Sequence, residues 1–284
     1  MVRVLIAFLA LVASLFLVGA DKDKGARSSS GGGDPEWTYR NTATYGREPY
    51  GPSDWYEDYP DCGKRAQSPI GIAAANVDTM VKGEQFSLQF FQNKCSSAEL
   101  SFEANEHTWE VIFQGCSDTP YLDFKGEQYD LVQVHIHSPS EHAIGGSLHD
   151  AEIHLVHLRE ETDDDILVVG VLMDATEYGT NIEIQHLWDA LVEGVVNHAL
   201  VTRVYDLIPP SPSFYYYEGS LTTPPCTERV KWIVMSDVVL IGKMQLDLFR
   251  TSVALHKDSK VDGQGNTNRP LQPLNKREIF HVVP

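Results

Sequence analysis

Short segments of alternating apolar and polar residues dominate the chain from Trp37 onward. These segments are rich in Val, Ile, Phe and Trp, and Gly, Pro, Asp and Ser separate them, which is typical of β-strands. The clearest predicted strands are residues 99–104, 107–113, 131–137, 151–158, 166–173 and 231–236. Because the long helix–strand alternation of a doubly wound sheet is missing, we expect a mainly β (α+β) single domain with a few short helices.

One helix is predicted from its apolar spacing. The residues that follow this spacing are Ile184, Leu187, Trp188, Leu191 and Val192.

The first twenty residues have a different pattern. Arg3 precedes an apolar run over 4–18, and Gly19 and Ala20 follow, which is typical of a cleaved signal peptide over 1–20. The alternative is a membrane anchor, but the run is shorter than the roughly twenty apolar residues that span a bilayer. We therefore expect a secreted, extracellular protein without a stable membrane anchor.

A Ser- and Gly-rich stretch follows the signal-like residues. Residues 21–36 have the composition of a flexible linker, so the folded domain is expected over 37–284. The chain has 284 residues and a formal net charge of −18, which disfavours nucleic acid and anionic membranes as partners. The acidic run Glu160 to Asp165 is open to two interpretations, a calcium site or a solvated loop between strands.

Four cysteines allow three disulfide pairings. Export favours disulfides, although four free thiols remain the alternative. If Asn105 and Glu106 form a two-residue hairpin turn, Cys95 and Cys116 lie directly opposite each other. That pairing leaves Cys62 and Cys226 for the second disulfide.

Three histidines have the spacing of a metal site. His135 and His137 are two residues apart in a predicted strand, so both side chains lie on one face, and His154 lies in the next predicted strand. Three neutral imidazoles leave a tetrahedral zinc ion one open position, which is the catalytic arrangement. The alternative is a solvated strand face that merely carries histidines. Gln133 and Glu152 each precede a histidine by two residues and are candidates to fix its second nitrogen.

Several motifs resemble the alpha class of carbonic anhydrases, in the same order along residues 37–280. They are Gln67-Ser68-Pro69-Ile70, residues 133–142 (QVHIHSPSEH), residues 151–157 (AEIHLVH), residues 219–226 (GSLTTPPC) and residues 268–274 (NRPLQPL).

This resemblance implies a zinc enzyme that converts carbon dioxide reversibly to bicarbonate and a proton through zinc-bound hydroxide. His135, His137 and His154 would be the ligands. Thr222 would accept a hydrogen bond from the hydroxide and donate one to Glu141. Zinc lowers the pKa of bound water to about 7, and a histidine shuttle can relay the released proton.

The resemblance also implies a large, mostly antiparallel central sheet, a Cys62–Cys226 disulfide and roles for further residues. His107 would be the proton shuttle, and the substrate pocket would contain Asn105, Val156, Val168, Leu221, Thr223, Val230 and Trp232. Carbon dioxide and bicarbonate would be the small-molecule partners.

Some positions depart from the family pattern. Ser138 stands where Trp is frequent in animal members, Asn268 where an aromatic residue is frequent, and Glu110 where a polar amide is common. Either Tyr39 or Tyr45 could border the cavity. The alternative function is a non-catalytic binding protein on the same fold. Such proteins usually lack one or more ligand histidines, and this chain has all three.

Overall fold

The computed structural model describes residues 35–40, 49–92, 99–104, 106–114, 119–159, 162, 165–193, 203–211 and 213–284. The expected signal peptide, Asn105, Cys95 and Cys116 lie outside these residues, as do most of the linker and of the acidic run. Within the described part of the chain, no helix is both long and apolar enough to cross a membrane.

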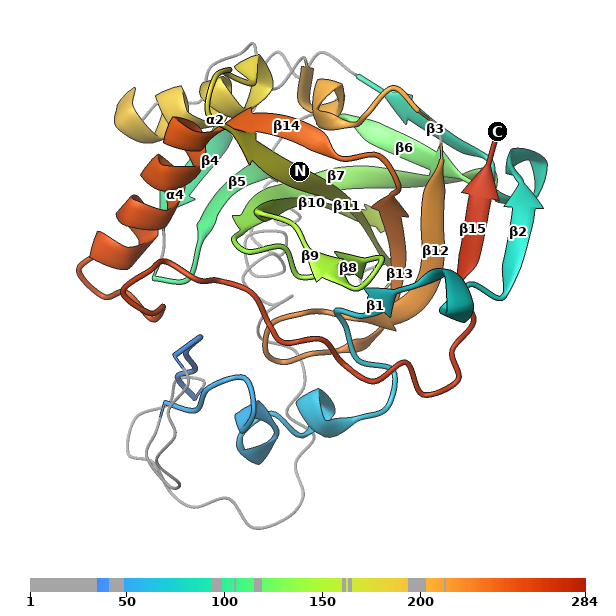
Figure 1. The fold of residues 1–284 in the computed structure, drawn as a ribbon, viewed down its shortest axis with the longest axis horizontal. Coiled ribbons are helices and arrows are strands. Elements are labelled where there is room, and N and C mark those ends of the chain that lie inside the picture. The colour runs from blue at the N-terminus through green and yellow to red at the C-terminus, as the bar shows by residue number, and fades with distance from the viewer. Residues whose placement is uncertain are drawn as a thin grey trace, which may run out of the picture.

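A large curled sheet of 12 strands forms the molecule's frame (Figure 1). Its main path runs in the order β2 (Thr79–Lys82), β15 (Phe280–Val283), β12 (Phe214–Ser220), β13 (Glu228–Met235), β11 (Ile166–Thr176), β10 (Ala151–Arg159), β7 (Glu127–His137), β5 (Trp109–Gln114) and β4 (Glu99–Ala104). Beside it, β14 (Val239–Gly242) pairs with β11, β6 (Tyr121–Phe124) with β7, and β3 (Leu88–Phe91) with β6. Most pairings are antiparallel, and only β11–β13, β11–β14 and β15–β2 are parallel among these strands. The predicted fold class is confirmed.

A smaller sheet and the helices complete the described fold. The small sheet contains β1 (Gly71–Ile72), β8 (Ala143–Ile144) and β9 (Ser147–Leu148). The α-helices are α2 (Ile182–Glu193) and α4 (Lys243–Leu255). The 3-10 helices are η1 (Trp55–Glu57), η2 (Pro60–Gly63), η3 (Ala74–Asn76), η4 (Gly83–Phe86) and η5 (Val204–Leu207).

The hairpin of β4 and β5 differs from its predicted register. Ala104 pairs with Trp109 and Leu100 with Phe113, so the connection spans 105–108 and is longer than the two-residue turn expected at Asn105-Glu106. The geometric reason for opposing Cys95 to Cys116 is therefore wrong, because a longer turn shifts the register. The two cysteines themselves lie outside the described residues.

One face of the sheet packs against the helices. Trp109 of β5 contacts Trp188 of α2 and Phe249 of α4, with ring centroids 4.6 and 5.4 Å away. The sequence pattern identified α2 but not α4, because Met244 and Leu248 are apolar yet exposed and obscure the helical period.

The opposite face carries the cavity. Along β7, Val134 and Ile136 belong to the core beneath the helices, while His135 and His137 project to the other side. After α4 the chain runs extended across the front of the sheet before it returns as β15 (Figure 1). This segment brings Thr267 against β7.

Candidate metal centre and cavity

Strand register brings the three predicted ligand histidines together. His135 and His137 lie on β7, and His154 of β10 is the direct cross-strand partner of His135. The ring centroids are 4.7 to 5.1 Å apart. Nδ1 of His154 lies 3.2 Å from Nε2 of His135. One ligand atom from each histidine lies within 4.8 Å of the other two.

Neighbouring groups decide which nitrogen His137 and His154 turn toward the centre. His137 donates Nδ1–H to the carbonyl of Thr267 at 2.7 Å, so its lone pair is on Nε2. His154 donates Nε2–H to Glu152 at 2.9 Å, so its lone pair is on Nδ1. Nε2 of His137 is buried without a hydrogen-bond partner. A buried, unpaired acceptor is costly, and a metal ion at this point would satisfy it.

Burial keeps the three rings neutral. It lowers the pKa of His135 well below its usual value, with His137 and His154 adding to the effect. It lowers the pKa of His137 to about 4, and it also lowers that of His154. Neutral imidazole is the form that binds metals, so the donor set fits a zinc ion with one open position.

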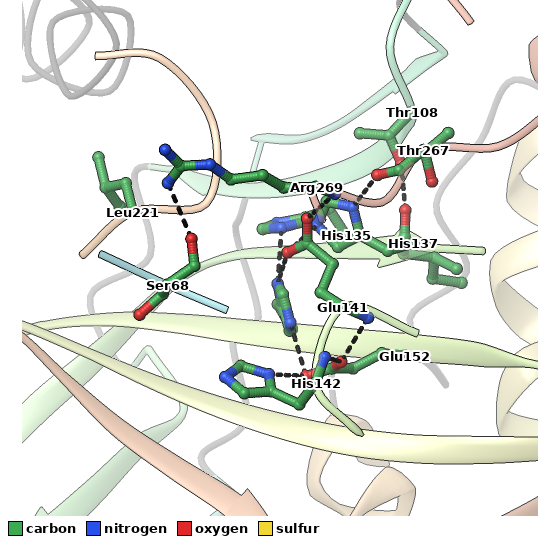
Figure 2. Close-up of polar contacts among 12 residues, drawn as sticks. Ser68, Thr108, His135, His137, Glu141, His142, Glu152, Leu221, Thr267 and Arg269 are labelled. Carbon is green, nitrogen blue, oxygen red and sulfur yellow. Dashed lines mark hydrogen bonds and ion pairs between the residues drawn. The ribbon is translucent and has the colours of Figure 1, made fainter. Parts of the chain in front are cut away.

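Glu152 connects His154 to a buried chain of hydrogen bonds. Figure 2 shows the contact of Glu152 with His142. Its Oε1 also accepts from Nδ1 of His142 at 2.7 Å, and Nε2 of His142 lies 2.7 Å from the hydroxyl of Tyr217. Burial acts to raise the pKa of Glu152, but His142 and His154 lower it well below its usual value. The carboxylate is therefore ionised and holds His154 in one orientation. His142 and Tyr217 were not among the predicted site residues.

Glu141 and Thr222 lie next to the histidines. Oε2 of Glu141 is 3.5 Å from Nε2 of His137, and its Oε1 accepts the backbone N–H of Arg269 at 2.9 Å (Figure 2). Burial raises the pKa of Glu141 to about 7, while His154, the Arg269 amide and the Thr222 hydroxyl act to lower it. The arrangement gives the Thr222 hydroxyl a carboxylate acceptor beside the metal centre.

A disulfide secures the loop that carries Thr222. Cys62 and Cys226 are bonded across a sequence separation of 164 residues. Within the loop, Cys226 N–H donates to the carbonyl of Thr223 at 2.8 Å. The guanidinium of Arg269 donates to the carbonyl of Cys62. Arg269, whose backbone N–H contacts Glu141, therefore also contacts a residue of the disulfide.

The histidines form the floor of a cavity of about 280 Å³. Its apolar wall consists of Val132, Val156, Ile166, Val168, Leu221 and Trp232. Its polar side consists of His107, Thr108, Glu110, Gln133, Thr222 and Thr223, with Trp37 and Tyr39 also contributing. Val132 and Ile166 were not predicted as pocket residues, although both lie within predicted strands.

One residue predicted for the substrate pocket, Val230, has a different place. Val230 is fully buried in the apolar cluster that backs the cavity wall, and it does not line the cavity. Of the two tyrosine candidates at the border, Tyr39 lines the cavity, and Tyr45 lies outside the described residues.

Gln133 has a partner other than His135. Its amide N–H donates to the carboxylate of Glu110, a residue of β5. Glu110 is the cross-strand partner of His135 and lines the same cavity. Nδ1 of His135 is buried without a hydrogen-bond partner.

His107 lies where the N-terminal segment meets the cavity. Its ring stacks on Trp37 with centroids 3.7 Å apart, and its Nε2 lies 3.2 Å from the carbonyl of Trp37. Burial lowers the pKa of His107, although the Trp37 carbonyl and Glu106 act to raise it.

The fold and the site together define a mostly β protein whose three-nitrogen centre has the layout of a catalytic metal site. A family profile described as eukaryotic-type carbonic anhydrase matches residues 50–283. Human carbonic anhydrase 6 is 29% identical over 300 residues, which cover 97% of this chain and 90% of the relative. A carbonic anhydrase of Nostoc sp. is 30% identical over 82% of this chain and 83% of its own length.

A solved structure agrees with these relatives. The alpha-carbonic anhydrase from Thermovibrio ammonificans, in complex with the inhibitor sulfanilamide, matches with a TM-score of 0.68 and 30% identity. The match covers 87% of this chain and 100% of that chain. The chain belongs to the eukaryotic-type, alpha-class carbonic anhydrases, which are enzymes, as its motifs predicted.

Proposed function

We propose that this protein is a zinc metalloenzyme that converts carbon dioxide and water reversibly to bicarbonate and a proton. The observation that carries this proposal is the convergence of three neutral imidazole nitrogens, from His135, His137 and His154, at the floor of the cavity. Zinc held there would supply a water nucleophile at neutral pH, because it lowers the pKa of coordinated water to about 7.

Thr222 and Glu141 would orient the nucleophile. Oε1 of Glu141 accepts the backbone N–H of Arg269, and the hydrogen bonds donated by this amide and by Thr222 favour the ionised carboxylate, although burial raises its pKa to about 7. An ionised carboxylate can only accept, so the Thr222 hydroxyl donates a hydrogen bond to it. The oxygen of Thr222 is then left to accept a hydrogen bond from the attacking water, which aims a lone pair of the nucleophile at the substrate.

The apolar wall would hold carbon dioxide. Val156, Val168, Leu221 and Trp232 line the cavity beside the histidines. These side chains offer a neutral, linear molecule an apolar surface and exclude ordered water from it. Substrate is thereby kept near the nucleophile without being bound tightly.

His107 would carry the proton between the cavity and solvent. It lines the cavity, and although burial lowers its pKa, the Trp37 carbonyl and Glu106 act to raise it, which favours an imidazole that accepts and releases protons in turn. The stacked Trp37 ring supports the imidazole at the edge of the polar side.

Residues 37–284 would form the catalytic domain of an exported protein that carries a signal peptide over 1–20. The Cys62–Cys226 disulfide supports this location, because disulfides persist in oxidising compartments. A second disulfide between Cys95 and Cys116 belongs to the same proposal, and it rests on export rather than on the register of the hairpin. A calcium role for the acidic run has less support, because Asp165 at its end already contacts Lys231 and Arg159.

Metal analysis combined with a carbon dioxide hydration assay tests the proposed function. We expect His154→Ala to lose most of its zinc and nearly all activity. His157→Ala is the matched control, since it also removes a fully buried imidazole from β10 but leaves the three converging nitrogens in place. Stoichiometric zinc and full turnover in His154→Ala would show that the ligand assignment is wrong.

A further inference from the structure

We propose that Glu110 is a specificity-determining residue that disfavours anions, including the product bicarbonate, relative to neutral carbon dioxide in the cavity. The inference rests on the proposed function. In the alpha-class family pattern, a polar amide is common at the position of Glu110. The inference assigns the carboxylate at this position a role in discriminating against anions.

Position and geometry direct Glu110 into the site. It is the direct cross-strand partner of His135 on the neighbouring strand, and cross-strand partners share one face of a sheet. Its side chain lines the cavity that the three histidines floor. Any anion that approaches the metal centre therefore enters a space that this carboxylate borders.

Gln133 contacts the carboxylate of Glu110. The amide N–H of Gln133 donates a hydrogen bond to it, so Glu110 is the acceptor of this pair. A side-chain carboxylic acid is ordinarily ionised at neutral pH.

The charge balance of the cavity makes this carboxylate important. Among the described residues that line the cavity, none is Lys or Arg, and Glu110 is the one carboxylate. Charges interact more strongly beside low-dielectric walls than in open water. The field of Glu110 therefore opposes an anion in the cavity, whereas carbon dioxide carries no net charge and is unaffected to first order.

Thiocyanate titration of the Co²⁺-loaded protein, followed by visible absorption, measures anion binding without relying on turnover. At about pH 6, where an ordinary carboxylate is ionised, we expect Glu110→Gln to lower the thiocyanate Kd by about three- to tenfold. Glutamine retains an acceptor oxygen for Gln133, so this substitution changes the charge and keeps the shape. Glu278→Gln, which neutralises an exposed glutamate outside the cavity, should leave Kd unchanged.

A second variant separates charge from space. Glu110→Ala should also tighten thiocyanate binding if charge is responsible. An effect in Glu110→Ala but not in Glu110→Gln would overturn the inference in favour of steric opening. An unchanged Kd in both variants, in protein that binds Co²⁺ and hydrates carbon dioxide, would overturn it while leaving the proposed function intact. A wild-type protein that neither takes up Co²⁺ nor hydrates carbon dioxide would contradict both.

Discussion

Individual hydrogen bonds decide which nitrogen His137 and His154 present to the cavity. His137 is held by a backbone carbonyl at Nδ1, and His154 is held by Glu152 at Nε2. The two rings consequently offer different nitrogens to the same point. His107 has a different environment, because it stacks on an aromatic ring at the edge of the cavity. His137 and His154 are thus each fixed by a hydrogen bond on the nitrogen away from the cavity, whereas the shuttle candidate His107 stacks on Trp37 and contacts its carbonyl.

Removal of His107 should slow proton transfer and spare the chemical step. We expect His107→Ala to lower kcat by tenfold or more, toward the roughly 10²- to 10⁴-fold typical of a lost acid–base group, with kcat/KM for hydration nearly unchanged. Small imidazole buffers should restore much of kcat, because they can enter the cavity and replace the relay. His149→Ala serves as a control, since His149 does not line the cavity. An unchanged kcat in dilute, bulky buffer would mean that protons leave by another route.

At the scale of elements, one strand pairing and one cross-linked loop build the centre. The antiparallel register of β7 and β10 places His154 opposite His135, and a shift by one residue would turn His154 to the other face. The loop after β12 carries Thr222 and is closed by the bond from Leu221 N–H to the carbonyl of Thr227 at 2.9 Å. The disulfide at Cys226 joins this loop to η2, far away in the sequence.

Loss of the disulfide should therefore affect stability and catalysis together. In the double variant Cys62→Ser/Cys226→Ser, no cross-link restricts the unfolded chain, so the unfolded state gains conformational entropy. We therefore expect the unfolding free energy to fall by about 2–4 kcal/mol. We also expect kcat to decrease, because the loop holding Thr222 loses its covalent anchor. Denaturant unfolding and the hydration assay measure the two effects. Equal unfolding midpoints for variant and wild type would contradict the structural role given to the disulfide.

At the scale of the whole molecule, the sheet separates two environments. One face supports the helices over a large apolar core, and the other holds the cavity and a second apolar cluster.

Titratable groups buried within this sheet couple folding to pH. His157 of β10 is fully buried, and burial lowers its pKa from 6.5 to about 3. Its Nε2 lies 3.0 Å from the hydroxyl of Tyr205.

Acid should consequently destabilise the protein through His157. Between its unfolded pKa of 6.5 and its folded pKa of about 3, the unfolded chain binds more protons. The unfolding free energy therefore falls as pH decreases through this window, by up to about 1.4 kcal/mol per pH unit for this group. His157→Phe keeps a ring against Tyr205 and should remove this contribution. Metal-free wild type and variant, unfolded in denaturant from about pH 7 to 4, should diverge as pH falls. Parallel stability curves would show that His157 does not contribute.

Local patterns in the sequence determined most strands, helix α2 and the common face of His135 and His137, because strand and helix periods are set by neighbouring residues. They also placed Glu152 beside His154, two residues away on one strand. The family motifs, in their order, determined the family. Helix α4 was missed because exposed apolar residues on its outer face hide its period.

Only the tertiary structure decided contacts between distant segments. The carbonyl of Thr267 contacts His137, which lies 130 residues away in the sequence. Every residue has a backbone carbonyl, so the amino-acid type at position 267 does not indicate this contact. Gln133 contacts Glu110 rather than the expected His135, because the β5–β7 register places that carboxylate alongside it. The β4–β5 register differs from the predicted one, because Ala104 pairs with Trp109 and the connection is longer than the expected two-residue turn. Such contacts depend on how strands pair and how the chain returns, which residues close together in sequence do not specify.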